Sequence, residues 1–226
     1  MTLKLSKPIL YLITPGATTE TTTPDSGEFQ NILQQVSAAV TAGIQLIQIR
    51  EKRLTAKVLF QLTAEVAAIA RGSSTRILVN DRADIAAGAG ADGVHLTTRS
   101  ITPDVIRETF GAKFLVGAST HSLLEARDAC RQDADFAVFG PIFPSPSKEK
   151  YGPPVGLGKL SEAAQELASF PLIALGGISL EHVNECLLAG ASGVAGITLF
   201  GEPKTLAITV ETIKQLAKSD LRRAAQ

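Results

Sequence analysis

The sequence has little cysteine and no excess of charge of either sign. Its 226 residues include two cysteines, and 22 Lys and Arg residues balance 22 Asp and Glu residues. Cys130 and Cys186 lack CxxC spacing and are too few for a secreted fold held by disulfides, so we interpret both as reduced packing residues. A chain without surplus positive charge lacks the footprint of a nucleic-acid binder. We therefore expect neither DNA nor RNA as a partner.

Long hydrophobic runs are also missing. No stretch reaches the roughly 18–20 consecutive apolar residues that span a bilayer. The apolar run Pro8–Ile13 is short and is not followed by the small-residue cleavage site of a signal peptide. With 45% hydrophobic residues and no net charge, the composition also differs from that of disordered chains. We expect a soluble, cytoplasmic protein with no membrane partner and a sizeable core.

The sequence does contain one unit repeated along its length, a short Ile/Val/Leu-rich run followed by a longer Ala-rich amphipathic stretch. The short runs are apolar throughout, which is typical of parallel strands buried on both faces. The predicted strands are Ile9–Thr14, Ile44–Arg50, Arg76–Asn80, Gly93–Leu96, Phe114–Ala118, Phe136–Phe139, Pro171–Leu175 and Gly193–Thr198. The predicted helices include Phe29–Ala42, Thr55–Arg71, Pro103–Phe110, Ser122–Gln132, Lys159–Ala168, Ser179–Ala189 and Lys204–Arg223.

Eight such units in this length predict an α/β fold, a (β/α)₈ TIM barrel forming a single domain over residues 1–226. Glycines at helix ends, as in Ala42-Gly43 and Ala189-Gly190, fit left-handed helix caps before the next strand. A doubly wound open sheet is the alternative, but no G-x-G-x-x-G motif follows the first strand. No linker or low-complexity segment divides the chain.

A barrel of this type carries its chemistry at the carboxyl ends of its strands. Gln48 and Arg50 alternate onto the inner side of their strand, and an inward arginine requires an anionic partner. That partner is either a bound anion or an acidic side chain across the barrel mouth. Asn80-Asp81 ends the third strand and suits Mg²⁺ shared with a phosphate, although the same residue types also cap helices.

Two loops have the features of phosphate sites. The loop Gly140–Lys148 holds three prolines, two serine hydroxyls and a lysine, which could wrap a phosphate and close over a substrate; a purely structural proline-rich loop is the alternative. Gly176-Gly177 follows the seventh strand and Gly196 lies near the end of the eighth. Glycines at this place allow backbone N–H groups to approach an anion.

The three histidines differ in position. His95 ends the fourth strand and His121 follows the fifth, where a neutral imidazole can carry protons near pH 7. A hydrogen-bonded structural role is the alternative for each. His182 falls in the first turn of a helix and is interpreted as a surface residue. No Cys/His cluster has zinc spacing and no Ser/His/Asp triad is indicated.

These motifs resemble the thiamine-phosphate synthase/TenI family over nearly the whole chain. The matching motifs are Gln48-Ile-Arg-Glu-Lys52, Asn80-Asp81-Arg82, Gly93-Val-His-Leu96, Gly117-Ala-Ser-Thr-His121, Gly140-Pro-Ile-Phe-Pro-Ser-Pro-Ser-Lys148 and Ala174-Leu-Gly-Gly-Ile178. The resemblance implies a barrel that acts on small phosphorylated pyrimidine and thiazole substrates. In synthases of this family, a pyrimidine diphosphate loses pyrophosphate and the nitrogen of a thiazole phosphate attacks the remaining methylene.

The resemblance also implies roles for individual residues. Gln48, Arg50, Lys52 and Asn80 would clamp the diphosphate, and Asp81 would bind Mg²⁺. Ser119, Ser145, Ser147 and Lys148 would hold pyrophosphate or the pyrimidine. Gly177, Ile197 and Thr198 would hold the thiazole phosphate. Arg50, Lys52, His121 and Lys148 are the expected catalytic residues.

One stretch departs from the synthase pattern. Synthases usually follow the fourth strand with G-Q-(E/D)-D, whose last acid is a second Mg²⁺ ligand, whereas this chain has Thr97-Thr98-Arg99-Ser100. Ser100 replaces the acid, and Arg99 adds positive charge. This stretch resembles TenI-type proteins, which include a thiazole tautomerase that needs no metal and for which His121 would be the acid/base. We therefore keep three hypotheses: a Mg²⁺-dependent synthase, a cofactor-free tautomerase, and a non-catalytic thiazole-phosphate-binding or regulatory barrel. A homo-oligomer is compatible with each.

Overall fold

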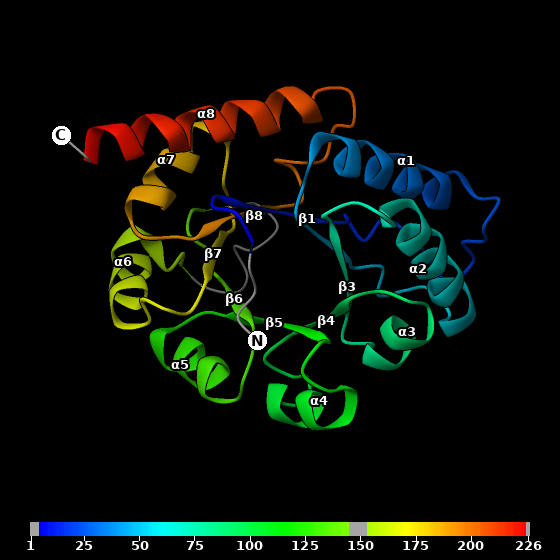
Figure 1. Cartoon of the computed structure of the whole chain (residues 1–226). Coiled ribbons are helices and arrows are strands. Elements are labelled where there is room, and N and C mark those ends of the chain that lie inside the picture. Colours follow the sequence, from blue (N-terminus) through cyan, green and yellow to red (C-terminus); the bar gives the residue numbers. More distant parts are fainter. Residues whose placement is uncertain (1–4, 145–152, 225–226) are drawn as a thin grey trace.

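The computed structural model describes residues 5–144 and 153–224, which form a closed barrel of parallel strands (Figure 1). The strands are β1 (Ile9–Ile13), β2 (Leu46–Ile49), β3 (Arg76–Asn80), β4 (Gly93–Leu96), β5 (Leu115–Thr120), β6 (Phe136–Phe139), β7 (Leu172–Leu175) and β8 (Gly193–Gly196). Each strand pairs with the next one in sequence, and β1 pairs with both β2 and β8. The predicted (β/α)₈ fold is confirmed.

Helices surround the strands in Figure 1, one after each strand. They are α1 (Gly27–Ala42), α2 (Ala56–Ala70), α3 (Ala83–Gly88), α4 (Pro103–Phe110), α5 (Leu123–Arg131), α6 (Gly156–Glu166), α7 (Leu180–Leu188) and α8 (Leu206–Ala224). Helix α3 is not among the predicted helices, because six residues are too few to show a periodic apolar stripe. No helix within the described ranges combines the length and apolar character needed to cross a bilayer.

Several predicted boundaries need correction. Strand β2 ends at Ile49 and β8 ends at Gly196, so Arg50 and the predicted strand residues after Gly196 lie in loops. Strand β5 continues to Thr120, beyond the predicted end at Ala118. Residue type alone does not mark where ladder hydrogen bonds stop, because polar residues such as Ser119 and Thr120 continue the β5 ladder while Ile197 lies beyond the end of β8. The corrections move Arg50 and Thr198 into loops and Ser119 and Thr120 into a strand end, all at the barrel mouth.

Side chains of the strands alternate between two hydrophobic layers. The outer layer joins the sheet to the helices, as where Leu10 and Ile47 pack in one cluster with Phe29 and Val36 of α1. The inner layer fills the barrel with residues of the opposite phase, including Tyr11, Leu46 and Phe136. Because strands and helices are both buried through apolar faces, the barrel interior is a packed core and not a channel.

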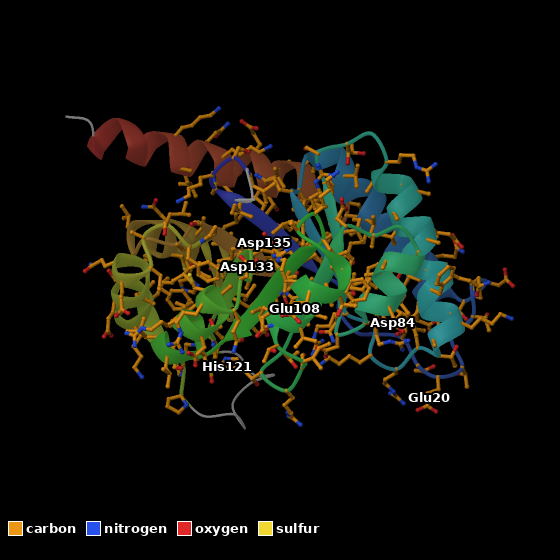
Figure 2. The ribbon with its side chains drawn as sticks, turned by 60° about the horizontal axis from the view of Figure 1, so that its bottom comes forward. Glu20, Asp84, Glu108, His121, Asp133 and Asp135 are labelled. Atoms are coloured by element: carbon orange, nitrogen blue, oxygen red, sulfur yellow. The ribbon has the colours of Figure 1, made fainter. Side chains whose placement is uncertain are left out.

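At the amino-terminal end of the strands, Arg107 of α4 ties the chain together. Its guanidinium forms ion pairs with Asp133 (3.1 Å) and Asp135 (2.9 Å), and the Asp135 carboxylate also accepts a hydrogen bond from the backbone N–H of Val116 (2.8 Å). Figure 2 shows both aspartates well apart from His121, which follows the carboxyl end of β5. The two ends of the barrel therefore carry separate polar clusters, one structural and one at the predicted site.

Gly117 of β5 makes room for the aromatic residues inside the barrel. A Cβ atom at Gly117 would collide with the ring of Phe136 and would lie 2.9 Å from Nδ1 of His95. We therefore expect Gly117→Ala to lower the free energy of unfolding by about 1–3 kcal/mol, the usual effect of overpacking. Chemical denaturation measures this change. Gly158→Ala is the control, because an added Cβ in α6 meets nothing within 4 Å, and this change should stabilise by about 0.5–1 kcal/mol. Equal effects of the two substitutions would contradict the packing argument.

Candidate active site

A chain of hydrogen bonds crosses the carboxyl ends of neighbouring strands and brings several predicted site residues together. The Nε2 of Gln48 donates to Oδ1 of Asn80 (3.1 Å), and Nδ2 of Asn80 donates to Oδ2 of Asp81 (2.8 Å). The hydroxyl of Ser100, in the loop after β4, donates to Oδ1 of Asp81. Gln48 is 2% exposed and Asn80 9%. We call these four residues the mouth chain.

Asp81 is the acidic member of the mouth chain. Its backbone has a φ of 59°, which is uncommon outside glycine, and its N–H continues the strand ladder to the carbonyl of His95 (3.0 Å). In the described part of the chain, no three His, Cys, Asp or Glu side chains gather as a metal cluster. One carboxylate nevertheless fits Mg²⁺ when phosphate oxygens and water complete the coordination shell. The mouth chain therefore suits a metal that arrives with a phosphorylated substrate.

Unpaired cations lie on loops at the same end of the barrel. Arg50 is half-buried, its N–H donates to Oγ1 of Thr14 (2.8 Å), and its Nη1 lies 3.3 Å from where a Cβ of Gly16 would be. Across residues 5–144 and 153–224, neither Arg50 nor Lys52 or Arg99 forms an ion pair within 4.0 Å. The alternative of an acidic partner for Arg50 across the mouth is therefore not found there, which favours a bound anion.

Glu51 is a buried carboxylate that the sequence analysis did not single out. It is 2% exposed and accepts hydrogen bonds from the N–H of Gly16 (3.0 Å) and from both the N–H (3.2 Å) and the hydroxyl (2.7 Å) of Thr18. These bonds tie the loop after β1 to the end of β2, beside Arg50. Its place between Arg50 and Lys52, in a strand-end motif facing a Thr-rich loop, is the sequence signal that could have identified it.

His95 lies inside the barrel, where it joins Ser119 of β5 to Tyr11 of β1. Its Nε2 is 2.9 Å from Oγ of Ser119, and its Nδ1 is 3.1 Å from the Tyr11 hydroxyl. Burial lowers the pKa of His95 to about 4 and raises the pKa of Tyr11 well above its usual value. His95 is therefore neutral at pH 7, and the structure favours the hydrogen-bonded role over proton carriage for this histidine.

His121 has the opposite environment. It is exposed at the barrel mouth (Figure 2), its backbone N–H donates to Oε2 of Glu125 (2.6 Å), and its Nδ1 contacts the carbonyl oxygen of Gly140. A carbonyl only accepts, so Nδ1 is the donor in this contact. Within the described residues Nε2 has no protein partner. The acid/base role of His121 stays a prediction.

The turn after β7 contains two glycines with positive φ, Gly176 (101°) and Gly177 (64°). A Cβ at Gly177 would collide with the backbone of the loop after β6, and the N–H of Phe143 in that loop donates to the carbonyl of Gly176 (3.0 Å). His182 stacks on Phe143 with ring centroids 4.0 Å apart, and its Nδ1 lies 3.1 Å from the carbonyl of Gly177. The interpretation of His182 as a plain surface residue was wrong, because its ring joins these two loops.

The remaining predicted residues fall in two groups. Ile197 and Thr198 follow β8 and are exposed, next to the turn after β7 because β7 and β8 are paired. Ser145, Ser147 and Lys148 lie outside the described residues. The structure thus joins Gln48 and Asn80 at the ends of β2 and β3, and the pairing of β7 with β8 brings the glycine turn next to the end of β8.

Comparison with known proteins agrees with this geometry. A family model described as thiamine monophosphate synthase matches residues 10–200. This chain belongs to that family. The putative thiamine-phosphate synthase of Geobacter sulfurreducens is 42% identical over 169 residues, which are 75% of this chain and 79% of the relative. The thiamine-phosphate synthase of Chlorobium phaeobacteroides is 40% identical over 159 residues, which are 70% and 77% of the two chains.

A solved structure shows the same fold. The thiamine phosphate pyrophosphorylase from Pyrococcus furiosus superposes with a TM-score of 0.77 at 25% sequence identity, covering 93% of this chain and 95% of that chain. The family resemblance that the motifs indicated is confirmed. The match also covers the strand ends that carry the mouth chain, since these lie between residues 10 and 200.

The burial of neutral His95 makes stability depend on pH. The unfolded chain binds a proton at this imidazole near its ordinary pKa of 6.5, whereas the folded chain resists protonation down to about pH 4. The unfolded state therefore gains protons first as the pH falls, and stability is lost between pH 6.5 and 4, by up to about 3 kcal/mol. Denaturation curves of wild type and His95→Gln across this window measure the difference. Parallel pH dependences of the two proteins would contradict the prediction.

Proposed function

We propose that this chain couples a hydroxymethylpyrimidine diphosphate with a thiazole phosphate and releases pyrophosphate, using the mouth chain and the unpaired cations beside it. The class of enzyme, a thiamine-phosphate synthase-type transferase of thiamine biosynthesis, was predicted from the sequence and is confirmed by the family model and the named relatives. The observation that carries the assignment of residues is the linkage of Gln48, Asn80 and Asp81 near half-buried Arg50, which has no ion-pair partner in the described part of the chain.

The diphosphate is placed against the ends of β2 and β3. Arg50 and Lys52 supply positive charge there without acidic partners among the described residues, so a dianionic or trianionic leaving group meets no competing carboxylate on them. Gln48 and Asn80 are held by their own hydrogen bond and add fixed dipoles. Neutralising the charge that builds up on the departing pyrophosphate lowers the barrier to breaking its bond to the pyrimidine methylene. The freed methylene carbon is then open to the thiazole nitrogen.

Mg²⁺ is the cation that this donor set fits, and when bound it would neutralise phosphate charge and orient the leaving group. Asp81 would be its protein carboxylate. Asn80 and Ser100 hold both oxygens of that carboxylate in place through hydrogen bonds. Because Ser100 is neutral, the site relies on the substrate's own phosphate oxygens more than a site with two acids would.

The thiazole phosphate is placed at the turn after β7 and the end of β8. Positive φ values at Gly176 and Gly177 let the backbone approach an anion closely. His182 and Phe143 brace this turn from the side of the neighbouring loop. Ile197 and Thr198 line the adjacent strand end. The two phosphate sites thus lie at different strand pairs of one barrel mouth, and the reacting atoms of the two substrates meet between them.

The test uses purified protein with both substrates and Mg²⁺, and it measures pyrophosphate release. We expect release only with both substrates, loss on chelation with EDTA, and a fall of about 100-fold or more in Asp81→Ala. Asp84→Ala is the matched control, because Asp84 is an exposed acid on α3 paired with Arg82 and removed from the mouth chain. Comparable loss in the control would contradict the role of Asp81.

A tautomerase is the second candidate, supported by neutral Ser100 and by the Nε2 of His121, which has no partner among residues 5–144 and 153–224. The same preparation is assayed with a carboxylated thiazole phosphate in EDTA. Metal-independent isomerisation that disappears in His121→Ala, without coupling activity in wild type, would overturn the synthase assignment. Binding of thiazole phosphate without turnover in either assay would instead indicate a binding module.

The Ser100→Asp variant tests the metal site without relying on activity. A second carboxylate beside Asp81 repels it in the metal-free protein and attracts a divalent cation. We expect Mn²⁺ affinity, measured by electron paramagnetic resonance, to rise about tenfold, which corresponds to ~1.4 kcal/mol of added attraction. Arg99→Gln lowers the net charge by the same one unit, one residue away, and is the control. If both variants bind Mn²⁺ equally well, the gain comes from net charge alone and Asp81 is not at the metal.

A further inference from the structure

A polar chain separate from the mouth chain runs through the apolar inner layer that surrounds Tyr11. It starts at the hydroxyl of Tyr11, passes through the ring of His95 and ends at the hydroxyl of Ser119. Tyr11 is 0% exposed and His95 2%, whereas Ser119 is half-buried at the barrel mouth. The buried side chains of Tyr11 and His95 are therefore linked by hydrogen bonds to the Ser119 hydroxyl, which is accessible from the mouth.

The direction of these hydrogen bonds follows from the surroundings of Tyr11. Its neighbours in the inner layer are apolar, and within residues 5–144 and 153–224 its hydroxyl has His95 Nδ1 as its hydrogen-bond partner. If Nδ1 carried the hydrogen, the Tyr11 O–H would be a buried donor without an acceptor, which is costly. Tyr11 therefore donates to Nδ1. His95 is 2% exposed and enclosed between the rings of Tyr11 and Phe136, where an unpaired charge is costly, so the imidazole has a single N–H, at Nε2 and directed to Ser119.

This direction determines what Ser119 can do. Its oxygen accepts a hydrogen bond from Nε2 of His95, so its own O–H, which has no acceptor among residues 5–144 and 153–224, can donate to a ligand. With the opposite tautomer, the Ser119 hydrogen would be directed at the imidazole and lost to a ligand. The geometry is held by packing, since the His95 ring lies 5.7 Å from Tyr11 and 6.1 Å from Phe136 between ring centroids.

We propose that Tyr11 and His95 are positioning residues that keep Ser119 as a hydrogen-bond donor to an anionic oxygen of the substrate's diphosphate. The inference rests on the proposed function in one respect, that a diphosphate occupies this mouth. Neither Tyr11 nor His95 touches the substrate. Their effect reaches it only through the orientation of one hydroxyl.

Binding of inorganic pyrophosphate in the presence of Mg²⁺, measured by calorimetry, tests the proposal without requiring turnover. Tyr11→Phe removes the hydroxyl and keeps the ring, so His95 is free to adopt the other tautomer. We expect the Kd for pyrophosphate to rise about three- to tenfold in Tyr11→Phe and at least as much in Ser119→Ala. In the double variant, Tyr11→Phe should add nothing further. Independent, multiplying losses would show that Tyr11 acts only through general packing and would overturn the proposal.

Phe136→Leu is the matched control for packing. Phe136 belongs to the same aromatic cluster, with its ring 5.6 Å from that of Tyr11, but it has no part in the hydrogen-bond chain. Any rise in Kd that it causes should be the same in wild type and in Ser119→Ala. If the effect of Phe136→Leu on Kd also disappeared in the Ser119→Ala background, as expected for Tyr11→Phe, a specific role of the Tyr11 hydroxyl would be contradicted.

Nuclear magnetic resonance of ¹⁵N-labelled histidine reports the tautomer directly, with His95→Gln assigning the signal. We expect the Nε2–H tautomer in wild type and a shift toward Nδ1–H in Tyr11→Phe; an Nδ1–H form in wild type would overturn the proposal. Failure of the proposed function and failure of this inference give different results. If wild type binds pyrophosphate with the expected pattern but does not couple the substrates, the proposed function fails and this inference stands. If Ser119→Ala binds pyrophosphate like wild type, the inference fails whatever the activity.

Discussion

Pairing of β1 with β8 closes the sheet, and the whole site depends on that closure. Tyr11 lies opposite both Leu46 of β2 and Ala195 of β8, so β1 is hydrogen-bonded on its two sides. Once the ring is closed, all carboxyl ends of the parallel strands face one mouth. Residues as distant in sequence as Gln48 and Gly177 then lie at the same end of the barrel. An open sheet of the same strands would distribute them along an edge.

Closure also produces an interior that side chains must fill. Polar groups inside it need hydrogen-bond partners within the protein, because water is excluded. His95 and Tyr11 satisfy each other there, and the missing side chain of Gly117 provides the space that their neighbour Phe136 needs. Burial of the imidazole in this layer keeps it uncharged. A histidine that looks catalytic by position is therefore a buried support. The exposed imidazole of the mouth is instead that of His121, whose Nδ1 donates to the backbone carbonyl of Gly140.

The fold and the family were predictable because both are expressed in periodic or local patterns. Eight apolar runs separated by amphipathic stretches indicate the barrel, and strand-end motifs such as Gln48–Lys52 identify the family. Properties that depend on packing in three dimensions were less accessible. Three examples are the contact of buried His95 with Tyr11, the stacking of His182 on Phe143 and the hydrogen bonds of Glu51 to the loop after β1. Each joins segments between 33 and 84 residues apart, and the sequence does not determine the path of the loops involved. Strand ends were also misplaced in both directions: β2 and β8 end before the predicted Arg50 and Thr198, whereas β5 continues through Ser119 and Thr120.

Overall neutrality and a cationic mouth are compatible because opposite charges are separated by location. Acidic groups near the other end of the barrel, such as Asp133 and Asp135, are neutralised locally by Arg107. At the mouth, the carboxylate of Glu51 accepts hydrogen bonds from the loop after β1, and that of Asp81 accepts them from Asn80 and Ser100. Arg50, by contrast, has no acidic partner among the described residues. The mouth thus presents cations to a phosphorylated substrate although the chain as a whole carries no net charge. Ser100 makes the mouth more positive still, because a neutral residue stands where synthases usually have an acid. The lower negative charge there favours binding of an anionic ligand such as the diphosphate.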